Sequence, residues 1–333
     1  MPVRGVTRTG RFPMELVSIL IPTYHRNELL REAIESALAQ TYDPVEVIVI
    51  DDSGEAHAEP VAAAYEDVTY VPLEENVGAN PARDVGLEAA SGRYVQFLDD
   101  DDRLRPEKLT RQVPLLDEST GVVYSGVEYS ETGRVERPDP SVRGDVLETA
   151  LAFDLWPPCY TATMLVDRRL LEPLRPFEHH GAGDTELLIG LAERTRFAFV
   201  DDPLVEKRIN PERSVGSSPE NVAHKRQIVA AYEGLFDRYP ESRKAAVSRT
   251  YRDEGRVRLA RKQWDPAAVT AFVRAGYHAP SLTTTGKCIA EALGSVLGRP
   301  GLSVATTAGE RGRDAMSGGL GRTLGRAVRR FGG

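Results

Sequence analysis

Four consecutive aspartates, at positions 99 to 102, follow the apolar residues 94–98. The valine, phenylalanine and tyrosine of that run are typical of a buried strand, which ends where burial ends. Adjacent carboxylates repel one another, and desolvating them without partners costs free energy. A strand that delivers them into a cleft therefore predicts a site for a hard cation that prefers oxygen ligands. The cluster alone is equally compatible with a solvated acidic loop or a helix cap.

The composition is that of a globular protein with one large domain or two smaller ones. The chain has 333 residues, of which 41% are hydrophobic and 28% are charged. A net charge of −8 argues against a nucleic-acid partner, which would normally require a basic balance. Cys159 and Cys288 lie far apart and indicate core thiols in a reducing compartment. Neither a secretory signal nor an apolar stretch of about 18 residues is present, which predicts a cytoplasmic protein.

Segments typical of strands and helices alternate over residues 17–125. Strands are expected at 17–21, 45–50, 68–71, 94–98 and 122–124, and helices at 27–40, 57–65, 81–90 and 106–116. This alternation predicts an α/β fold with a mainly parallel sheet flanked by helices. Ligands of such sheets bind beyond the carboxyl ends of the strands, so functional residues should follow strands.

Three strand ends and one loop place polar groups at the same predicted edge. They are Pro22-Thr23-Tyr24, Asp51-Asp52, the loop at 76–84 and the aspartates at 99–102. Taken singly, Asp51-Asp52 before Ser53-Gly54 is compatible with an ordinary turn, and Arg83 with a charge on a helix surface. Their coincidence at one edge favours a binding site.

Over residues 16–215 these motifs resemble the family 2 glycosyltransferases, which have the GT-A fold. Residues 19–24 match the family's opening motif, and residues 49–54 match its second motif. The Asn-x-Gly-x-x-x-Ala-Arg motif is matched by Asn76, Gly78, Ala82 and Arg83. Residues 97–102 match the metal-binding Asp-x-Asp segment, and Pro106 and Lys108-Leu109 follow it. Asp84 replaces the asparagine that is usual after Arg83. The order and spacing of the motifs carry the resemblance.

The resemblance implies a nucleotide-sugar donor, linked to UDP, GDP or dTDP, and a divalent cation. Asp101 would bind Mg²⁺ or Mn²⁺, which neutralises charge on a departing diphosphate. Asp99 would hold the ribose or the metal shell, and Asp51 would bind the base. The other residues implied at the nucleotide are Pro22, Thr23, Tyr24 and Arg83, whose guanidinium suits phosphate and carboxylate oxygens.

The second half is expected to supply the base and to receive the acceptor. Residues 181–187 open a predicted helix, where Asp184 is compatible with a simple N-cap. In the family this position carries the general base, commonly within Glu-Asp, whereas Gly183 precedes it here. The resemblance therefore implies that Asp184 deprotonates the acceptor, and hydrogen bonding at the helix start should keep it ionised.

Other positions near the site match the family less completely. The segment at 159–166 has strand character, and a closing strand pair is expected over 197–208. Arg208 matches the family's Arg-x-His as a candidate diphosphate contact, although Asn210 replaces the histidine, and Ser214 is a candidate loop serine. His179 and His180 indicate either an acceptor contact or a surface turn.

The expected domains are an N-terminal extension at 1–15, a GT-A domain at 16–217 and a helical appendage at 218–299. The GT-A domain divides into a nucleotide-sugar and metal half at 16–125 and an acceptor half at 126–217. The appendage should contain helices at 223–239, 241–262 and 266–277. Residues 300–333 form a basic tail for which disorder is expected. The weaker alternative is peripheral contact with the cytoplasmic face of the membrane, through this tail and Ile289, Leu293, Val296 and Leu297.

The resemblance thus implies a metal-dependent, inverting glycosyltransferase that acts on a glycan or lipid-linked glycan. A nucleotidyltransferase remains an alternative, although such enzymes usually have a glycine-rich basic loop after the first strand, where this chain has Pro22-Thr23-Tyr24-His25. A processive polysaccharide synthase is disfavoured, because it would have membrane spans and a Gln-x-x-Arg-Trp motif, and this sequence shows neither. A dehydrogenase is disfavoured because no Gly-x-Gly-x-x-Gly follows an early strand. A non-catalytic nucleotide-sugar-binding or scaffold protein becomes credible if Asp184 does not face the cleft.

Overall fold

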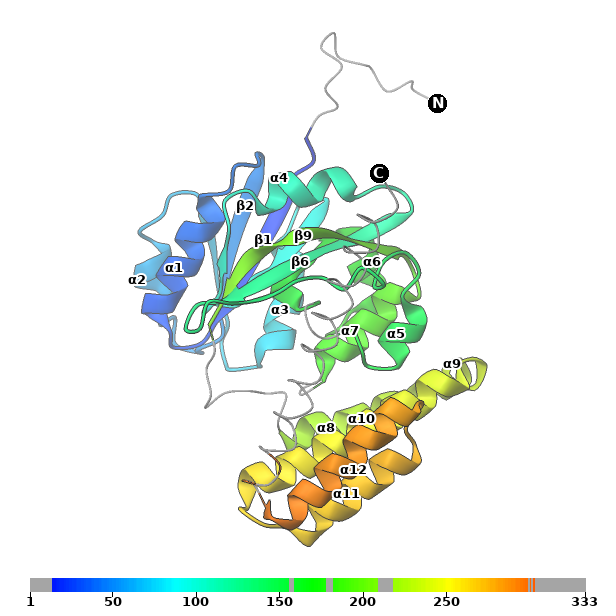
Figure 1. Ribbon diagram of the computed structural model, residues 1–333. Helices are drawn as coiled ribbons and strands as arrows, with labels where there is room; N and C mark the ends of the chain where they lie inside the picture. Colours follow the sequence, from blue (N-terminus) through cyan, green and yellow to red (C-terminus); the bar gives the residue numbers. More distant parts are fainter. Residues whose placement is uncertain are drawn as a thin grey trace, which may run out of the picture. The chain divides into compact units, whose positions relative to one another are not determined.

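The strands and helices expected over residues 17–125 form in the predicted order (Figure 1). The computed structural model describes residues 14–155, 159–177, 182–208, 218–298, 300 and 302. Its internal contacts divide the chain into two units, Met1–Ser214 and Val215–Gly333, which are described separately. The first unit contains a sheet with its covering helices, and the described part of the second consists of helices.

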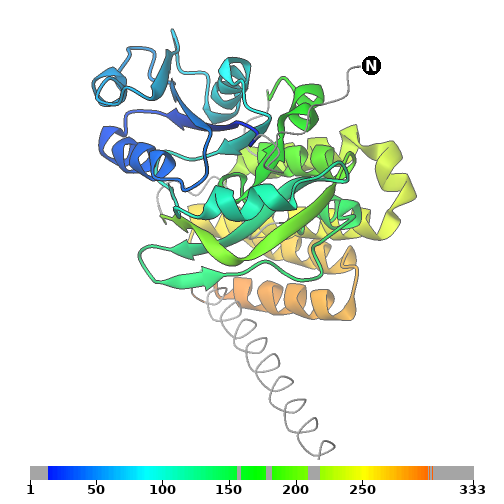
Figure 2. The same ribbon diagram turned by 90° about the horizontal axis from the view of Figure 1, so that it is seen from above.

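One mixed sheet runs through the first unit, with strand order β3-β2-β1-β4-β8-β6-β9-β5 and β7 paired to β6. The strands are β1 (Val17–Thr23), β2 (Val45–Asp51), β3 (Val68–Pro72), β4 (Tyr94–Phe97), β5 (Arg103–Leu104), β6 (Thr120–Tyr129), β7 (Arg134–Glu136), β8 (Leu165–Asp167) and β9 (Arg196–Lys207). Strands β1 to β4 are parallel, as predicted for the nucleotide half. Beyond β4 the sheet is mixed, because β8 runs antiparallel to both β4 and β6. The long strands β6 and β9 are parallel and lie side by side (Figure 1 and Figure 2).

Helices cover both faces of the parallel part of the sheet. The helices of the first unit are α1 (Asn27–Leu38), α2 (Glu59–Ala62), α3 (Ala79–Ala89), α4 (Lys108–Gln112), α5 (Leu147–Leu151), α6 (Arg168–Leu171) and α7 (Gly183–Ala192). Ile19 packs in one core cluster with Ile34 of α1. The next residue, Leu20, faces α3, because successive strand side chains point to opposite faces. Gly86 allows α3 to approach closely, since a Cβ there would lie 2.7 Å from the Ile50 side chain.

The strand order changes direction beside β1. From β1 the chain moves outward to β2 and β3, and then returns across the sheet to place β4 on the other side of β1. Open α/β sheets bind their ligands at such a switch point, outside the carboxyl ends of the strands. Thr23, at the end of β1, and Asp99, two residues after β4, both lie at this edge.

Two predicted strands differ from the structure. The strand predicted at 159–166 is wrong in its first half, because Thr161–Thr163 form a short 3₁₀ helix (η2) and only Leu165–Asp167 is extended. The strand pair predicted over 197–208 is instead the single strand β9 of 12 residues. Its Pro203, which suggests a break, lies where the β6–β9 register shifts. Such an irregularity accommodates a residue that cannot donate a ladder hydrogen bond.

The second unit contains α8 (Pro219–Ala231), α9 (Glu233–Arg238), α10 (Pro240–Arg261), α11 (Pro266–Tyr277) and α12 (Leu282–Val296). Asp265 caps α11 as predicted, since its side chain accepts a hydrogen bond from the Ala267 amide. The helix predicted at 223–239 is divided into α8 and α9. Leu259, Phe272 and Ala292 belong to the core of this unit. No helix in the described part of the chain has the length and apolar character that a bilayer span requires.

Candidate active site

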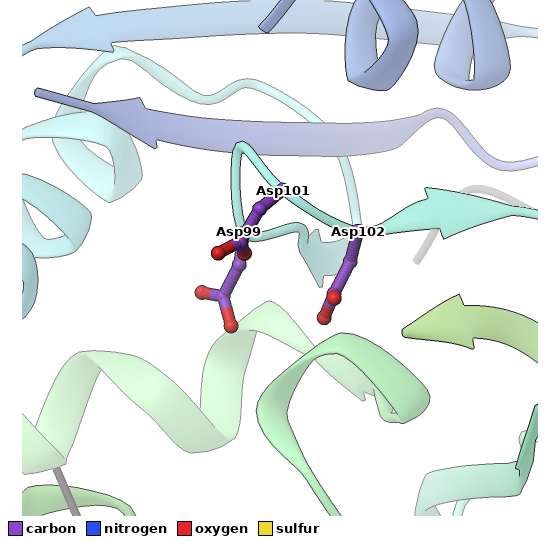
Figure 3. Close-up of side chains that lie close together, drawn as sticks. All are labelled: Asp99, Asp101 and Asp102. Atoms are coloured by element: carbon purple, nitrogen blue, oxygen red, sulfur yellow. The ribbon is translucent and has the colours of Figure 1, made fainter. Parts of the chain in front are cut away.

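The loop after β4 gathers three carboxylates around one space. Asp99, Asp101 and Asp102 can each offer an oxygen such that these oxygens lie within 4.8 Å of one another. Figure 3 shows Asp101 at the turn of the loop and Asp102 where the chain leads on to β5. Carboxylate oxygens at this spacing are a suitable donor set for Mg²⁺, Mn²⁺ or Ca²⁺.

Two cationic side chains that the sequence analysis did not place in the site hold these carboxylates. Arg26, just before α1, places Nη1 2.7 Å from Asp100 Oδ1 and 2.8 Å from Asp101 Oδ2. Lys207, at the end of β9, places Nζ 2.9 Å from Asp102 Oδ2 and 3.9 Å from Asp99 Oδ2. Position in the fold explains both omissions, because each residue joins the aspartates only after the sheet has formed.

Arg83 connects the loop of aspartates 99–102, called the acidic loop below, to the second half of the unit. It is buried in α3, with Nη2 2.6 Å from Asp99 Oδ1 and Nη1 3.3 Å from Asp184 Oδ1. Its Nη1 also donates to Asn80 Oδ1 at 2.9 Å. The Nε atom is buried and has no hydrogen-bond partner among the described residues. Arg83 thus joins an aspartate of each half, and it retains one unused donor.

Gly183, where the chain departs from the family's Glu-Asp pair, explains how α3 and α7 come so close. A Cβ at Gly183 would lie 2.0 Å from Asn80 Nδ2. Any larger residue would have to displace the Asn80 side chain, which is hydrogen-bonded to Arg83. The glycine therefore permits the approach that brings Arg83 within reach of Asp184.

Asp184 is not the helix cap that the alternative interpretation required. Ala182 occupies the cap position of α7 and no side chain caps the helix, so that alternative is wrong. The Asp184 carboxylate contacts Arg83 instead. Burial raises the pKa of Asp184, and the nearby Asp99 adds to this effect while Arg83 opposes it. The hydrogen bonds expected from Asp184 at the helix start are therefore absent from α7, and Arg83 is the main group that favours its ionised form.

The acidic loop together with Asp184 carries an excess of negative charge. The site contains five carboxylates, Asp99, Asp100, Asp101, Asp102 and Asp184, and three cationic side chains, Arg26, Arg83 and Lys207. When all are ionised, two negative charges are not balanced, which matches the charge of a divalent cation. Burial raises the pKa of Asp100 to about 6 and that of Asp102 to about 7. Burial alone would also raise the pKa of Asp99, but Arg83 and Lys207 hold it below its ordinary value.

Asp51, the predicted base-binding residue, is buried and fixes its own loop. Its Oδ2 accepts hydrogen bonds from the Ala58 amide at 2.7 Å and the Tyr70 hydroxyl at 2.8 Å, and its Oδ1 accepts one from the Ser53 amide at 3.0 Å. Burial opposes ionisation, yet these bonds lower the pKa of Asp51 below its ordinary value. Its contact with the base stays a prediction, made by a carboxylate that already has three protein donors.

Asp52 has a comparable role, which the sequence analysis did not assign. Its two carboxylate oxygens accept hydrogen bonds from the amides of Val77 at 2.7 Å and Gly78 at 2.9 Å. Gly78 has a φ of +92°, a conformation that glycine adopts without strain, and it directly precedes α3. Asp52 therefore fixes the start of the helix that carries Arg83.

The remaining predicted residues are placed as follows. Pro22 and Thr23 are buried at the end of β1, and Thr23 donates to Asp100 Oδ2 at 2.8 Å, whereas Tyr24 is exposed. The Arg208 side chain pairs with Glu32, and its backbone amide donates to Asp102 Oδ1 at 3.2 Å. Its diphosphate contact stays a prediction. His179, His180, Asn210 and Ser214 lie outside the described residues.

A buried polar network supports the acidic loop. Lys108 is fully buried and donates to Gln96 of β4 and to Gln112, the latter at 2.6 Å. Gln112 in turn donates to the carbonyl oxygens of Val123 in β6 and Thr163 in η2, at 2.9 and 3.0 Å. Burial holds the pKa of Lys108 well below its ordinary value. The Lys-Leu of the sequence motif thus has a structural role, which is to join β4, β6 and η2.

A separate cavity of about 340 Å³ lies on another face of α3. It is lined by the loop after β3, by α3 and by the segment before α7: Leu73, Glu74, Glu75, Val77, Pro81, Asp84, Val85, Pro176 and Phe177. Asp84, which replaces the family's asparagine, is paired there with Arg175 at 2.6 Å. The substitution therefore has a partner inside the same unit.

Comparisons with known proteins agree with this fold. The model of glycosyl transferase family 2 matches residues 18–175. An uncharacterized glycosyltransferase of Rickettsia prowazekii is 29% identical over 212 residues, which are 61% of this chain and 67% of that protein. Escherichia coli WfaP, named a UDP-Glc:alpha-D-GlcNAc-diphosphoundecaprenol beta-1,3-glucosyltransferase, is 36% identical over 118 residues, 35% of this chain and 47% of that protein. The crystal structure of S. aureus TarS in complex with UDP-GlcNAc matches with a TM-score of 0.56 and 18% identity, covering 83% of this chain and 90% of that chain.

The fold is that of the GT-A glycosyltransferases. Residues 18–175 match the family 2 glycosyltransferase model, in agreement with the motifs of the sequence. The TarS likeness shows the fold alone at this level of identity.

Proposed function

We propose that this glycosyltransferase moves a sugar from a nucleoside-diphosphate sugar to a hydroxyl of a glycan or lipid-linked glycan, with inversion at the sugar carbon. A divalent cation and Asp184 as general base complete the proposal. Two relatives support the substrate classes: TarS binds UDP-GlcNAc, and WfaP is named for a lipid-diphosphate acceptor.

One observation carries the proposal most directly. Asp184 Oδ1 lies 3.3 Å from Arg83 Nη1, and the same guanidinium lies 2.6 Å from Asp99. A candidate base is therefore one side chain away from the candidate metal-binding carboxylates. About a third of the Asp184 side chain is exposed, so an acceptor hydroxyl can reach it. This position disfavours a scaffold protein, for which Asp184 was expected to lie away from the cleft.

The transfer step uses these groups as follows. The acceptor hydroxyl gives its proton to the Asp184 carboxylate as its oxygen forms a bond to the anomeric carbon. The bond from that carbon to the diphosphate oxygen breaks on the opposite face, and the electron pair leaves with the nucleoside diphosphate. Asp101, with Asp99 and Asp102, would hold a divalent cation that neutralises the charge of the leaving group.

A donor screen tests the proposal. Release of nucleoside diphosphate is measured with UDP-, GDP- and dTDP-sugars, each with Mg²⁺, with Mn²⁺ and with EDTA. We expect one nucleotide class to be turned over, and only when metal is present. Binding of every donor without turnover would favour a non-catalytic protein. Formation of a nucleotide-sugar from a sugar phosphate and a nucleoside triphosphate would favour a nucleotidyltransferase.

The substitution Asp101→Ala tests the metal site. We expect it to abolish the metal-dependent part of nucleotide binding, because no other side chain at that point of the loop replaces a carboxylate ligand. Titration of the nucleoside diphosphate with and without Mn²⁺ measures the effect. The matched control is Asp67→Ala, which removes an exposed aspartate just before β3. If Asp101→Ala retains the metal dependence of the control, the assignment of Asp101 is incorrect.

A further inference from the structure

Helix α12 exposes a stripe of apolar side chains. Leu282, Ile289, Leu293 and Val296 are 91%, 53%, 68% and 55% exposed. Intervals of seven, four and three residues place them on one side of the helix. The opposite side packs into the unit, where Cys288, Ala292 and Ser295 are buried. The stripe is therefore a second apolar side of a helix whose first side already forms a core.

Neighbouring residues enlarge the stripe into what we call the apolar face: Trp264, Val273, Tyr277, Leu282, Ile289, Leu293, Val296 and Leu297, each more than half exposed. Helices α11 and α12 follow one another in the helical unit (Figure 1). The indole Nε1 of Trp264 donates to the Val296 carbonyl at 3.1 Å, which joins the turn before α11 to the end of α12. Exposed apolar side chains gathered on two packed helices indicate an interaction surface.

The segment of the sequence that carries the apolar face is basic. Residues 261–333 contain eleven Lys and Arg against four Asp and Glu, whereas the preceding 260 residues contain 31 and 46. Two of the four acids are neutralised within the unit. Asp265 caps α11 and lies 3.5 Å from Arg258, and Glu291 is buried with Arg252 and Arg256 at 2.7 and 2.6 Å. The apolar face thus belongs to a basic segment of an otherwise acidic chain.

We propose that the apolar face docks on the surface of an anionic lipid bilayer, with α11 and α12 lying in the plane of the interface. Apolar side chains at helical spacing with nearby arginine and lysine are typical of helices that bind in this way. The positive segment is attracted to anionic headgroups, while the acidic remainder of the chain is repelled by them. Two copies of a basic face would repel one another, which disfavours self-association as the purpose of this surface.

Vesicle binding by the full-length chain tests the inference. The probes are vesicles of phosphatidylcholine alone and vesicles with phosphatidylglycerol, and the bound fraction is measured by co-sedimentation. We expect binding to the anionic vesicles that weakens at high salt. The triple variant Ile289→Ser, Leu293→Ser, Val296→Ser should bind on the order of tenfold or more weakly, because three apolar side chains that would insert into the bilayer are lost. The matched control replaces Leu38, Leu115 and Val135, exposed residues of the first unit, by serine and should bind like the wild type.

A second variant strengthens the face instead of weakening it. Gly286 lies in α12 between Leu282 and Ile289, and a Cβ there meets open space. Gly286→Leu should therefore fold and should bind anionic vesicles several-fold more tightly. Gly234→Leu, at an equally open glycine of α9, is the matched control and should change nothing.

Four outcomes would overturn the inference. They are no binding of the wild type to anionic vesicles, equal binding by the triple serine variant, no gain in Gly286→Leu, or a wild-type dimer that the triple variant converts to a monomer. The last would assign the face to a second copy of this chain. Because Asp101→Ala should bind vesicles like the wild type, failure of this inference and failure of the proposed activity are distinguishable.

Discussion

Two strands of the first unit end in adjacent aspartates, and the two ends are built differently. After β2, Asp51 and Asp52 accept hydrogen bonds from backbone amides and a tyrosine hydroxyl. After β4, the acidic loop is held by arginine and lysine side chains. The pKa of Asp51 is lowered by its hydrogen bonds, whereas burial raises the pKa of Asp100 and of Asp102.

The difference is between aspartates held by the backbone and aspartates held by cationic side chains. Backbone amides are fixed by the fold, so Asp51 and Asp52 stabilise two loops whether or not a ligand is bound. Side-chain cations can move, and the acidic loop retains an excess of negative charge that a divalent cation would balance. We therefore expect changes after β2 to affect stability first, and changes around the acidic loop to affect activity first.

The largest expected effect is on catalysis. Asp184→Asn should lower the rate of transfer by a factor on the order of 10² to 10⁴, the range that general-base catalysis contributes. The side chain keeps its shape and α7 has no side-chain cap to lose, so fold and donor affinity should change little. The measurements are the transfer rate at saturating donor and the donor affinity of the same preparation.

Glu186→Gln is the matched control, because Glu186 is the other acid in the first turn of α7. It should retain most of the activity. A loss of rate in Glu186→Gln with normal turnover in Asp184→Asn would transfer the role of base to Glu186.

The sequence predicted the elements and motifs better than the contacts between them. Periodicity placed β1 to β4 and α3 within one or two residues, because these are strongly patterned segments that bury one or two faces. It also placed the aspartates at 99–102 at a strand end. The closing strand pair expected from the family resemblance is one strand, β9, in which a register shift accommodates Pro203.

The partners of the aspartates could not be predicted in the same way. Arg26 and Lys207 lie 74 and 105 residues from the aspartates to which they donate, Asp100 and Asp102. Nothing in the local sequence distinguishes them from surface charges. Gly183 was visible as a departure from the family pattern, but its reason, the proximity of Asn80, depends on how α3 and α7 pack.

A middle-sized effect, on stability, contrasts the two strand ends directly. Asp52→Asn replaces one acceptor by an amide donor that faces the Val77 or Gly78 amide, so the free energy of unfolding should fall by about 1–3 kcal/mol. Asp100→Asn makes the same change in the acidic loop, where it removes a buried charge from a crowded cluster. There the change should be less than about 1 kcal/mol. Urea unfolding without added metal measures the free energy of unfolding of both variants. Equal losses in the two variants would mean that the two strand ends do not differ in this way.

The smallest expected effect is the pH dependence of stability. The raised pKa of Asp100, about 6, and of Asp102, about 7, mean that the folded chain binds protons that the unfolded chain has released. Stability should therefore decrease as the pH rises from about 4 to about 7. The lowered pKa of Asp51 has the opposite sign, and its contribution is lost on acidification below about pH 4, outside this window.

Asp102→Asn removes one of the carboxyl groups whose pKa is raised. Between pH 5 and pH 7.5 the melting temperature of this variant should therefore fall less than that of the wild type, with a difference of about a few degrees. Thermal unfolding of both proteins at the two pH values, without metal, gives this difference, and Asp67→Asn serves as the exposed control. Mn²⁺ should then stabilise the wild type more at pH 7.5 than at pH 5, because protons compete with the cation for the same carboxylates. If Mn²⁺ stabilised the protein equally at both pH values, these carboxylates would not be its ligands, and the acidic loop would resemble the end of β2 after all.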